Sequence, residues 1–470
     1  MFSRSNASVS RASLSIVAGS AWALVASLAV AQPSPPAAAP PPPLPVAKSA
    51  PAPVAFVPAS TPEQEKLRLV PAKRYPGKVH LLPATMDTTQ WGWFNNAQPP
   101  VLHVNSGDTV VFETMMHSHN QVVPGTTIEQ IKKLRTDFPG RGPHTLTGPV
   151  YIEGAEPGDV LKVRLNKIVP RAYGTNFNVP GMFGEFPTKF PDGQVKYFYL
   201  DLERKVAEFA PGIEIPLAPF PGTIGVARAE PGQYSSVPPG RYAGNLDIRD
   251  LTEGATLYVP VFVKGALLWT GDSHAAQGNG EINLTALETA YKEMNVTVDV
   301  LKNMKLEWPR IETKDSWITV GIDRDLNKAL DILKEETTTL LVEQRKVTKD
   351  EAAKLMMAAW DCRVTQVVDI NKGLHCFNAK NVKERRRIEV LPEKENKRYL
   401  VTVGKDADLN KAMDSASWAM IALLEQDKKL SRLDAYGLAS MVMDCRLAAP
   451  NATQKAVYCL VPKSTWVASR

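Results

Sequence analysis

Between residues 77 and 309, short apolar runs alternate with turns built from glycine, proline, asparagine and aspartate. Residues 99–114, PPVLHVNSGDTVVFET, alternate apolar and polar positions around a Ser-Gly-Asp turn, and residues 151–168 do so around Glu-Pro-Gly-Asp. Residues 257–272 continue this spacing. A two-residue period bounded by tight turns is typical of β-strands. The pattern predicts a β-rich barrel or sandwich with one short helix near 128–134.

A duplication follows, in which two segments match at a constant offset of 83 residues. WITVGIDRDLNKALD (317–331) aligns with LVTVGKDADLNKAMD (400–414), and the Asp-Cys-Arg triplet at 361–363 aligns with the same triplet at 444–446. No gap is needed between these matches. Each copy is therefore predicted to contain a short strand, a turn, two helices and a closing strand.

The two copies carry matching signals for the start of each helix. The first helices are predicted to begin near Asp325 and Asp408, because aspartate can accept hydrogen bonds from the free amides of a helix N-terminus. Thr348 and Ser431 are the predicted N-caps of the second helices. The predicted fold class is α+β, a β-rich core followed by two tandem α/β repeats.

The first residues have the three parts of a secretory signal peptide. Arg4 and Arg11 precede an apolar stretch that ends in an Ala-Val-Ala cleavage site at 29–31. The stretch is short for about 30 Å of hydrocarbon, so cleavage is favoured over an uncleaved anchor. Prolines clustered in 32–62 remove amide donors and favour an extended spacer. We expect an exported protein, periplasmic or secreted, without membrane association after cleavage. The predicted divisions are a signal peptide (1–31), a Pro/Ala-rich linker (32–62), the β-rich core (63–310), a first repeat (311–393) and a second repeat (394–470).

Composition and charge are those of an ordinary globular protein. The 470 residues are 44% hydrophobic and 22% charged, with a formal net charge of +6. The basic residues are scattered, and the densest run, VKERRRIEV at 382–390, is interrupted by two glutamates. A solvated surface turn is the better interpretation of this run, so no nucleic-acid partner is expected.

All four cysteines lie in the duplication, with the same spacing of 14 residues in each copy. In an exported chain this arrangement predicts two disulfides, Cys362–Cys376 and Cys445–Cys459. Pairing between the copies and a zinc site remain alternatives, although the sequence has no Cys-x-x-Cys pair. The loop at 363–373 differs between the copies, so only the first copy would contribute to a site there.

Side chains that could bind a metal ion are concentrated in a few turns of the predicted core. Asp272 and His274 follow an apolar strand and stand two residues apart, so on a strand both would face the same side. A carboxylate and an imidazole on one face are a common way to place two metal ligands. A turn cap at Asn245 and an exposed loop at 117–119 are the simpler alternatives. The candidate metal ligands are Asp272, His274, Asp247 and Asn245, with His117 and His119 as possible additional ligands.

Six stretches follow one another in the sequence between about residues 76 and 380. They are TGPVYIEGAEPGDVLKV (147–163), PGTIGVA (221–227), GNLDIRDL (244–251), GDSHAAQGNGEI (271–282), LEWPRIET (306–313) and DCRVTQVVDINKGLHC (361–376). Together they resemble the acetamidase/formamidase family, and the second repeat resembles an extra C-terminal copy of its last segment. The resemblance implies a β-rich hydrolase that uses a divalent metal ion to split formamide, acetamide and similar short amides into ammonia and a carboxylate. The sequence has no G-x-S-x-G, P-loop or H-E-x-x-H motif, which would indicate other chemistry.

Amide hydrolysis needs a strong nucleophile at neutral pH and a proton for the leaving nitrogen. A bound metal ion acidifies a water molecule, and a carboxylate within hydrogen-bond reach can carry the proton. Glu156 and Glu281 are the two candidate proton carriers. Zinc is the expected ion and calcium the alternative, with a small amide as the partner and a homo-oligomer as a possible assembly. The competing hypothesis is a non-catalytic metal- or small-amide-binding protein on the same scaffold.

Two positions depart from the pattern that the resemblance implies. Relatives tend to carry an acidic residue near the position where this chain has His117 and His119, so either imidazole could replace an oxygen ligand. Asn279 stands where relatives tend to have aspartate, which removes one negative charge from the candidate site.

Overall fold

The computed structural model describes residues 77–381, 396–448 and 454–467 of the chain. Lys73–Arg470 forms one compact unit, so the divisions predicted at 310 and 393 lie within it and stay predictions. The predicted signal peptide and linker, and the basic run at 382–390, lie outside the described residues. In the described part of the chain, no helix has both the length and the apolar character that crossing a bilayer requires.

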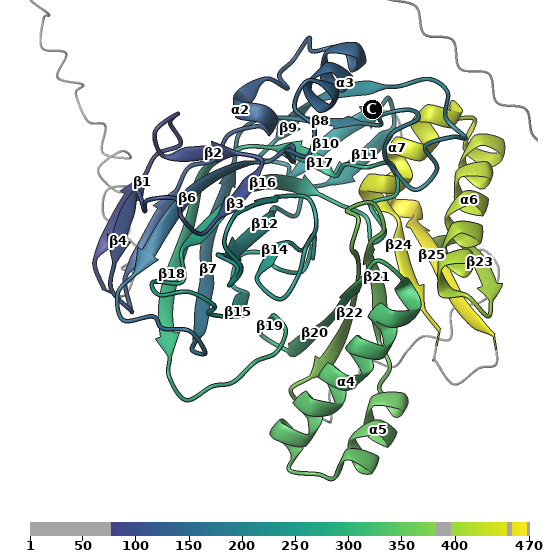
Figure 1. Ribbon diagram of the computed structural model, residues 1–470. Helices are drawn as coiled ribbons and strands as arrows, with labels where there is room; N and C mark the ends of the chain where they lie inside the picture. Colours follow the sequence, from purple (N-terminus) through teal and green to yellow (C-terminus); the bar gives the residue numbers. More distant parts are fainter. Residues whose placement is uncertain (1–76, 382–395, 449–453, 468–470) are drawn as a thin grey trace, which may run out of the picture. The chain divides into compact units, whose positions relative to one another are not determined.

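A mixed sheet of 12 strands runs from the core into both C-terminal repeats (Figure 1). In spatial order its strands are β1 (Val79–Leu82), β5 (Thr109–Phe112), β18 (Tyr291–Leu301), β7 (Val160–Pro170), β15 (Thr256–Pro260), β19 (Arg310–Glu312), β20 (Ser316–Asp323), β22 (Lys372–Ala379), β21 (Cys362–Gln366), β24 (Asp444–Leu447), β25 (Lys455–Pro462) and β23 (Tyr399–Asp406). β1 and β5 are parallel, and the other neighbours are antiparallel.

A second sheet of 11 strands lies beside the first and is built entirely from the core. Its main path is β11 (Ile213–Pro216), β10 (Val206–Ala210), β9 (Val195–Asp201), β8 (Tyr173–Phe177), β17 (Leu287–Thr289), β16 (Leu268–Ala276), β12 (Phe220–Val226) and β14 (Ala243–Asn245). β6 (Thr145–Ile152) pairs with β16 and also with β2 (Thr89–Trp91) and β4 (Leu102–Val104), while β3 (Trp93–Asn95) and β13 (Gln233–Ser235) form a separate pair.

Side chains from both sheets meet in one apolar core. Val163 of β7 and Val296 of β18 belong to the same buried cluster as Leu146 of β6, Ile224 of β12 and Trp269 of β16. All five are completely buried. Each such side chain contributes about 1.5–3 kcal/mol to stability relative to an exposed one, so this layer holds the two sheets together. The predicted β-rich core of an α+β fold is confirmed.

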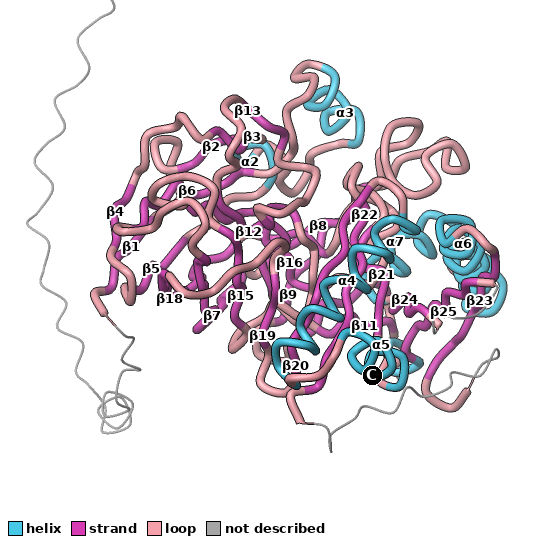
Figure 2. Tube along the Cα trace, turned by 60° about the horizontal axis from the view of Figure 1, so that its bottom comes forward, coloured by secondary structure: helices cyan, strands magenta, loops and turns pink. Residues whose placement is uncertain are grey.

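Each repeat folds as a strand, two helices and two closing strands, and Figure 2 shows these helices beside the same part of the 12-stranded sheet. Among the described residues, the helices of the core are α2 (His117–Asn120) and α3 (Ile128–Thr136). The first repeat contains α4 (Leu326–Arg345) and α5 (Lys349–Ala358), and the second contains α6 (Leu409–Lys428), α7 (Arg432–Val442) and a 3-10 turn η2 (Lys463–Thr465). The side chains of Asp325 and Asp408 cap α4 and α6 as predicted. Thr348 and Ser431 likewise cap α5 and α7.

One glycine in each repeat allows a helix to pack closely on a strand. A Cβ on Gly321 of β20 would overlap the carbonyl oxygen of Ala329 in α4, and a Cβ on Gly404 of β23 would overlap that of Ala412 in α6. The two glycines occupy corresponding positions of the duplication. The same strand–helix packing is therefore built twice.

The two repeats contact each other reciprocally at the N-termini of α4 and α6. Asn327 Nδ2 donates a hydrogen bond to Asp408 Oδ1 at 2.8 Å, and Asn410 Nδ2 donates one to Asp325 Oδ1, also at 2.8 Å. Asn327 and Asn410 correspond in the duplication, as do the two aspartates. This exchange of equivalent bonds is the pattern of a two-fold symmetric interface, here within one chain.

The predicted disulfides Cys362–Cys376 and Cys445–Cys459 are both present, with Cα–Cα distances of 4.1 Å and 4.0 Å. In each case the two cysteines lie directly opposite each other on antiparallel neighbours, β21 with β22 and β24 with β25. The alternatives of pairing between the copies and of a zinc site are not adopted, since none of the four cysteines is free.

Candidate metal centre

β16 brings Asp272 and His274 together, as their two-residue spacing predicts. His274 Nε2 lies 3.3 Å from Asp272 Oδ2, and both side chains are buried. His274 Nδ1 lies 2.9 Å from Gln277 Oε1, while Gln277 Nε2 donates to the carbonyl oxygen of Asp247 at 3.0 Å. Because Gln277 Oε1 is an acceptor, Nδ1 of His274 carries the hydrogen. In its neutral form, His274 would present the lone pair of Nε2 to Asp272 and Glu288, as a metal ligand does. Burial lowers the pKa of His274, but the charges of Glu288 and Asp272 outweigh it and raise that pKa well above its ordinary value.

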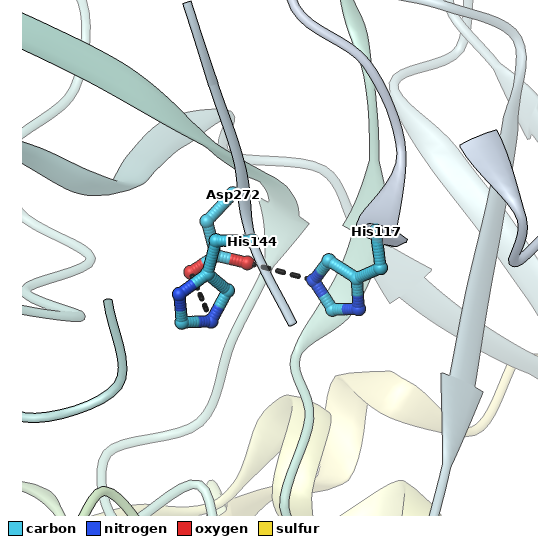
Figure 3. A group of neighbouring side chains, drawn as sticks. All are labelled: His117, His144 and Asp272. Carbon is cyan, nitrogen blue, oxygen red and sulfur yellow. Dashed lines mark hydrogen bonds and ion pairs between the residues drawn. The ribbon is translucent and has the colours of Figure 1, made fainter. Parts of the chain in front are cut away.

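Two further imidazoles approach Asp272 (Figure 3). His117, in α2, places Nε2 2.9 Å from Asp272 Oδ1, and His144, just before β6, places Nε2 3.7 Å from Asp272 Oδ2. Ligand atoms of these three buried side chains all lie within 4.8 Å of one another. Two ligands of one tetrahedral zinc ion are separated by about 3.3 Å, because each Zn–N or Zn–O bond is about 2 Å long.

Carboxylates extend this cluster along the cavity wall. Glu288 Oε2 lies 3.2 Å from His274 Nε2 and 3.4 Å from His117 Nε2. Oxygens of Asp247, Glu281 and Asp369 form an adjoining group within 4.8 Å of one another, and all three side chains are buried. Carboxylates this close repel one another unless protons or a cation lie between them. The arrangement can therefore hold a divalent cation.

Asn245 lies at the same cavity, at the end of β14. Its Oδ1 accepts a hydrogen bond from Thr223 Oγ1 at 2.5 Å, and Thr223 Oγ1 also lies 3.3 Å from Asp272 Oδ2. Thr223 therefore holds the amide of Asn245 beside Asp272 at the wall of the cavity.

The pKa values of the imidazoles reflect opposing effects of burial and charge. Burial lowers the pKa of His117, but hydrogen bonds to Asp272 and Glu288 outweigh it and raise the pKa to about 9. Burial lowers the pKa of His144 to about 4, because the nearby charge of Asp272 only partly offsets it. Burial dominates for His144, whereas hydrogen bonds to carboxylates dominate for His117, so the pKa values of these two neighbouring imidazoles shift in opposite directions.

The carboxyl groups of Asp247, Glu281 and Asp369 share one buried environment. Burial raises the pKa of Asp247 above its usual range. Burial and the charge of Asp247 together raise the pKa values of Glu281 and Asp369 well above their usual ranges. The protonated form of Glu281 is therefore favoured more than in a free carboxyl group, which is the direction of shift that a general acid needs.

The backbone at the cluster is strained and closely packed. Asp247, Asp272 and Glu281 have φ values of 54°, 48° and 48°. Such left-handed conformations cost of order 1–3 kcal/mol each in non-glycine residues and are concentrated at functional sites. Gly222 of β12 keeps space open nearby, since a Cβ there would lie 2.5 Å from His274 Cε1 and 2.6 Å from Asp272 Oδ2.

The cluster lines a cavity of about 380 Å³. This volume is roughly that of a dozen molecules in liquid water, far larger than formamide or acetamide. The walls away from the cluster are mostly apolar. They include Val122, Ile131, Phe177, Val179, Phe183, Leu284, Val237, Val368 and Ile370.

Two of the predicted site residues do not reach the cavity. Glu156 lies in the turn between β6 and β7, where its side chain is 51% exposed and its Oε1 is 3.7 Å from Lys264 Nζ. His119 is separated from His117 because Ser118 and His119 adopt left-handed φ values of 54° and 53°. The chain therefore turns instead of continuing as a strand, and His119 Nε2 lies 3.3 Å from Thr89 Oγ1. The predicted residues that line the cavity are Asp272, His274, Asp247, Asn245, Glu281 and His117.

Sequence reasoning missed three members of the cluster. His144 is a lone histidine before a strand, and Glu288 enters only because β17 pairs with β16 with Glu288 opposite His274. Neither has a local signal. Asp369 does have a local signal in the sequence, because it lies in the loop that differs between the two copies, where the second copy has Ala452.

The chain matches the model of the Acetamidase/Formamidase family over residues 84–233 and 228–457. It is similar to an acetamidase of Mycolicibacterium smegmatis, with 29% identity over 218 residues, which are 34% of this chain and 54% of that protein. It is also similar to a putative formamidase of Schizosaccharomyces pombe, with 27% identity over 259 residues, 43% of this chain and 61% of that protein. The chain thus spans little more than half the length of these relatives.

Solved structures resemble the fold as well. The acetamidase of Bacillus halodurans matches with a TM-score of 0.58 and 29% identity over 64% of this chain and 97% of that one. The acetamidase of Yersinia enterocolitica matches with a TM-score of 0.59 and 28% identity over 66% and 94%. A gamma lactamase from Delftia acidovorans, at 19% identity and a TM-score of 0.56 over 81% and 90%, shows likeness of fold alone.

Proposed function

The chain belongs to the acetamidase/formamidase family, and we propose that it hydrolyses amides to ammonia and a carboxylate with the help of a bound divalent metal ion. One observation carries the proposal beyond the family: three imidazoles and several carboxylates converge, buried, on one wall of a cavity. Amides are small polar molecules that such a cavity admits, and the cluster has the groups that their hydrolysis requires.

The residues present fit a metal ion. Nε2 of His274 and Nδ1 of His144 are buried and make no hydrogen bond within the described part of the chain. Leaving a buried polar atom unpaired costs about 1–3 kcal/mol, which a cation at the cluster would offset. Mixed imidazole and carboxylate ligands suit zinc, whereas calcium takes oxygen ligands. We propose zinc, held by residues drawn from Asp272, His274, His117, His144 and Glu288.

A bound divalent ion polarises a carbonyl oxygen and acidifies water. The chain supplies the remaining chemistry. Asn245, fixed by Thr223, offers an amide to the substrate. Glu281 holds a proton that it can give to the leaving nitrogen as the C–N bond breaks. The oxygen of water joins the carbonyl carbon, and a proton from that water restores Glu281. The apolar walls keep other water from the reacting groups.

Ammonia release from formamide, acetamide and propionamide by zinc-loaded protein tests this function, with manganese, nickel and calcium as alternative ions. Asp272→Asn and His274→Ala should lose both bound metal and turnover. His103→Ala is the matched control, because His103 is 57% exposed and pairs with Glu153 at the surface. Bound metal without ammonia from any amide would overturn hydrolysis and favour the binding-protein alternative. Metal and turnover that survive both substitutions would place the site elsewhere.

We also propose that the protein is exported, to the periplasm or beyond the cell. Two disulfides support this proposal, because such bonds form and persist in oxidising compartments. Cell fractionation with an antibody against the chain tests it. We expect a processed form outside the cytoplasm, and a cytoplasmic protein with four reduced thiols would contradict the proposal.

A further inference from the structure

The guanidinium of Arg135 has no negative partner among the described residues. Arg135, in the last turn of α3, lines the same cavity as the proposed zinc ligands Asp272, His274, His117, His144 and Glu288. Its Nη1 is buried and makes no hydrogen bond to any described residue. Arg135 is half-buried, and a buried guanidinium nitrogen without an acceptor is costly, so an anion bound beside it would offset this cost.

The position of Arg135 is fixed relative to the cluster. Its Nη2 donates to Ser118 Oγ at 2.5 Å, and Ser118 is adjacent to His117 in the chain. Burial lowers the pKa of Arg135 to about 10, so the guanidinium still carries its charge at neutral pH. With Nη2 directed to Ser118, Nη1 is the buried guanidinium nitrogen that has no acceptor among the described residues.

The surface around Arg135 is apolar. Ile131, one helical turn earlier in α3, is buried against Phe177 and Val179. Phe183 and Ile370 line the cavity and are 39% and 53% exposed, which places them towards its mouth. Formamide and acetamide have no carbon chain to occupy this surface, whereas a run of methylenes would bury it.

A second guanidinium adds to the positive potential. Arg141 also lines the cavity, and its Cζ lies 4.6 Å from the centre of the Trp91 ring and 5.4 Å from that of Phe138. These rings hold the guanidinium by cation–π contact without neutralising its charge. The cavity thus combines carboxylates and imidazoles at the cluster with apolar walls and two arginines.

We propose that the substrate is an amide whose acyl chain ends in a carboxylate, with that carboxylate bound by Arg135 and the intervening methylenes packed on the apolar wall. The inference rests on the proposed amide hydrolysis and names its substrate class. Water adds to the amide carbon, the C–N bond breaks, and the products are a dicarboxylate and ammonia. Arginine suits this role because its planar donors match a carboxylate.

Kinetics with matched substrates test the proposal. The full-length, metal-loaded protein is assayed with the monoamides of succinate, glutarate and adipate, and with their neutral methyl esters. We expect kcat/KM for the best monoamide to exceed that of its ester by about 10- to 100-fold, the range of a hydrogen bond to a buried charge. Arg135→Gln should remove this preference, and Arg135→Lys should keep part of it. Lys133→Gln is the matched control, since Lys133 lies on the same helix and is 72% exposed.

The outcomes separate this inference from the proposed function. Equal kcat/KM for acid and ester, or a preference that survives Arg135→Gln, would overturn the inference and leave amide hydrolysis standing. If no amide is hydrolysed, the hydrolytic function fails, and calorimetry with glutarate decides the carboxylate subsite. Binding at least about tenfold weaker in Arg135→Gln than in wild type would support that subsite, whereas equal binding would overturn it. Arg135→Lys keeps the test usable if the glutamine variant does not fold.

Discussion

Asn279 donates a hydrogen bond from Nδ2 to Asp444 Oδ1 at 2.7 Å, and this bond joins the loop of the site to the second repeat. The amide of Cys445 donates to the carbonyl oxygen of Asn279 at 3.2 Å, so side chain and backbone both take part. Glu281 follows two residues later. The family resemblance predicts aspartate at 279, and asparagine instead lets this loop meet Asp444 without repulsion between two carboxylates.

Asn279→Asp should therefore destabilise the protein by about 1–3 kcal/mol and lower kcat/KM, because two buried carboxylates would face each other. Asp444→Asn in the same background should restore part of both losses. Urea unfolding of the four proteins in this double-mutant cycle should give a coupling energy of about 1–2 kcal/mol. The control is Asp361→Asn, at the corresponding position of the first repeat. Purely additive effects would show that this bond does not hold the loop.

Glu281→Gln should lower kcat for amide hydrolysis by about 100- to 10,000-fold, the usual effect of losing a positioned proton carrier. Bound metal should remain, because the imidazoles and Asp272 are unchanged. Glu156→Gln should leave kcat unchanged, since Glu156 is half-exposed in a surface turn. Ammonia release and elemental analysis measure the two properties separately. A fully active Glu281→Gln enzyme would assign proton transfer to another group.

Asp408 should make the contact between the repeats sensitive to acid. Hydrogen bonds from Asn410 and Asn327 lower the pKa of Asp408 to about 2, below its ordinary 3.8. A carboxyl group with a lower pKa in the folded state stabilises the fold above its unfolded pKa and loses this effect as pH falls towards its folded pKa. Asp408→Ala should cost about 1 kcal/mol at pH 7, the usual value of a helix cap, and less near pH 2. Urea unfolding at several pH values measures the difference, and a pH-independent gap would contradict the assignment.

Loss of either disulfide should cost on the order of 3 kcal/mol, because each closes a loop of similar length. The effects on activity should differ. The loop between Cys362 and Cys376 carries Asp369 to the cavity, so the Ala/Ala variant of this pair should lower kcat/KM beyond its effect on stability. The Ala/Ala variant of Cys445 and Cys459 is the matched comparison. Equal losses of kcat/KM at a temperature where both variants are folded would count against this role for the loop.

Features that depend on short-range physics could be predicted from sequence. Helix caps such as Asp325 need only the free amides of their own first turn, and the meeting of Asp272 with His274 needs only the period of one strand. The duplication made the cysteine pairing predictable from the sequence, because each copy repeats the same spacing.

The remainder of the site depends on which strands become neighbours. Glu288 joins the cluster through the register of β17 on β16, and no local pattern encodes that register. His117 and His119 are both possible additional ligands in the sequence, but left-handed φ values at Ser118 and His119 turn the chain so that only His117 lines the cavity. A conformation confined to single residues leaves no periodic signal, so the placement of His119 could not be predicted.

The reciprocal bonds between Asn327 and Asp408 and between Asn410 and Asp325 join two copies that lie in one chain and can therefore differ in sequence. Between identical subunits, every substitution appears on both sides of the interface, and association weakens on dilution. Here one chain supplies both halves, so the contact persists at any protein concentration and each half can change alone. The first copy retains Asp369 at the cavity, and the second, with Ala452 at the corresponding position, holds the loop of Glu281 instead. The two copies thus pack symmetrically on each other but contribute different residues to the site.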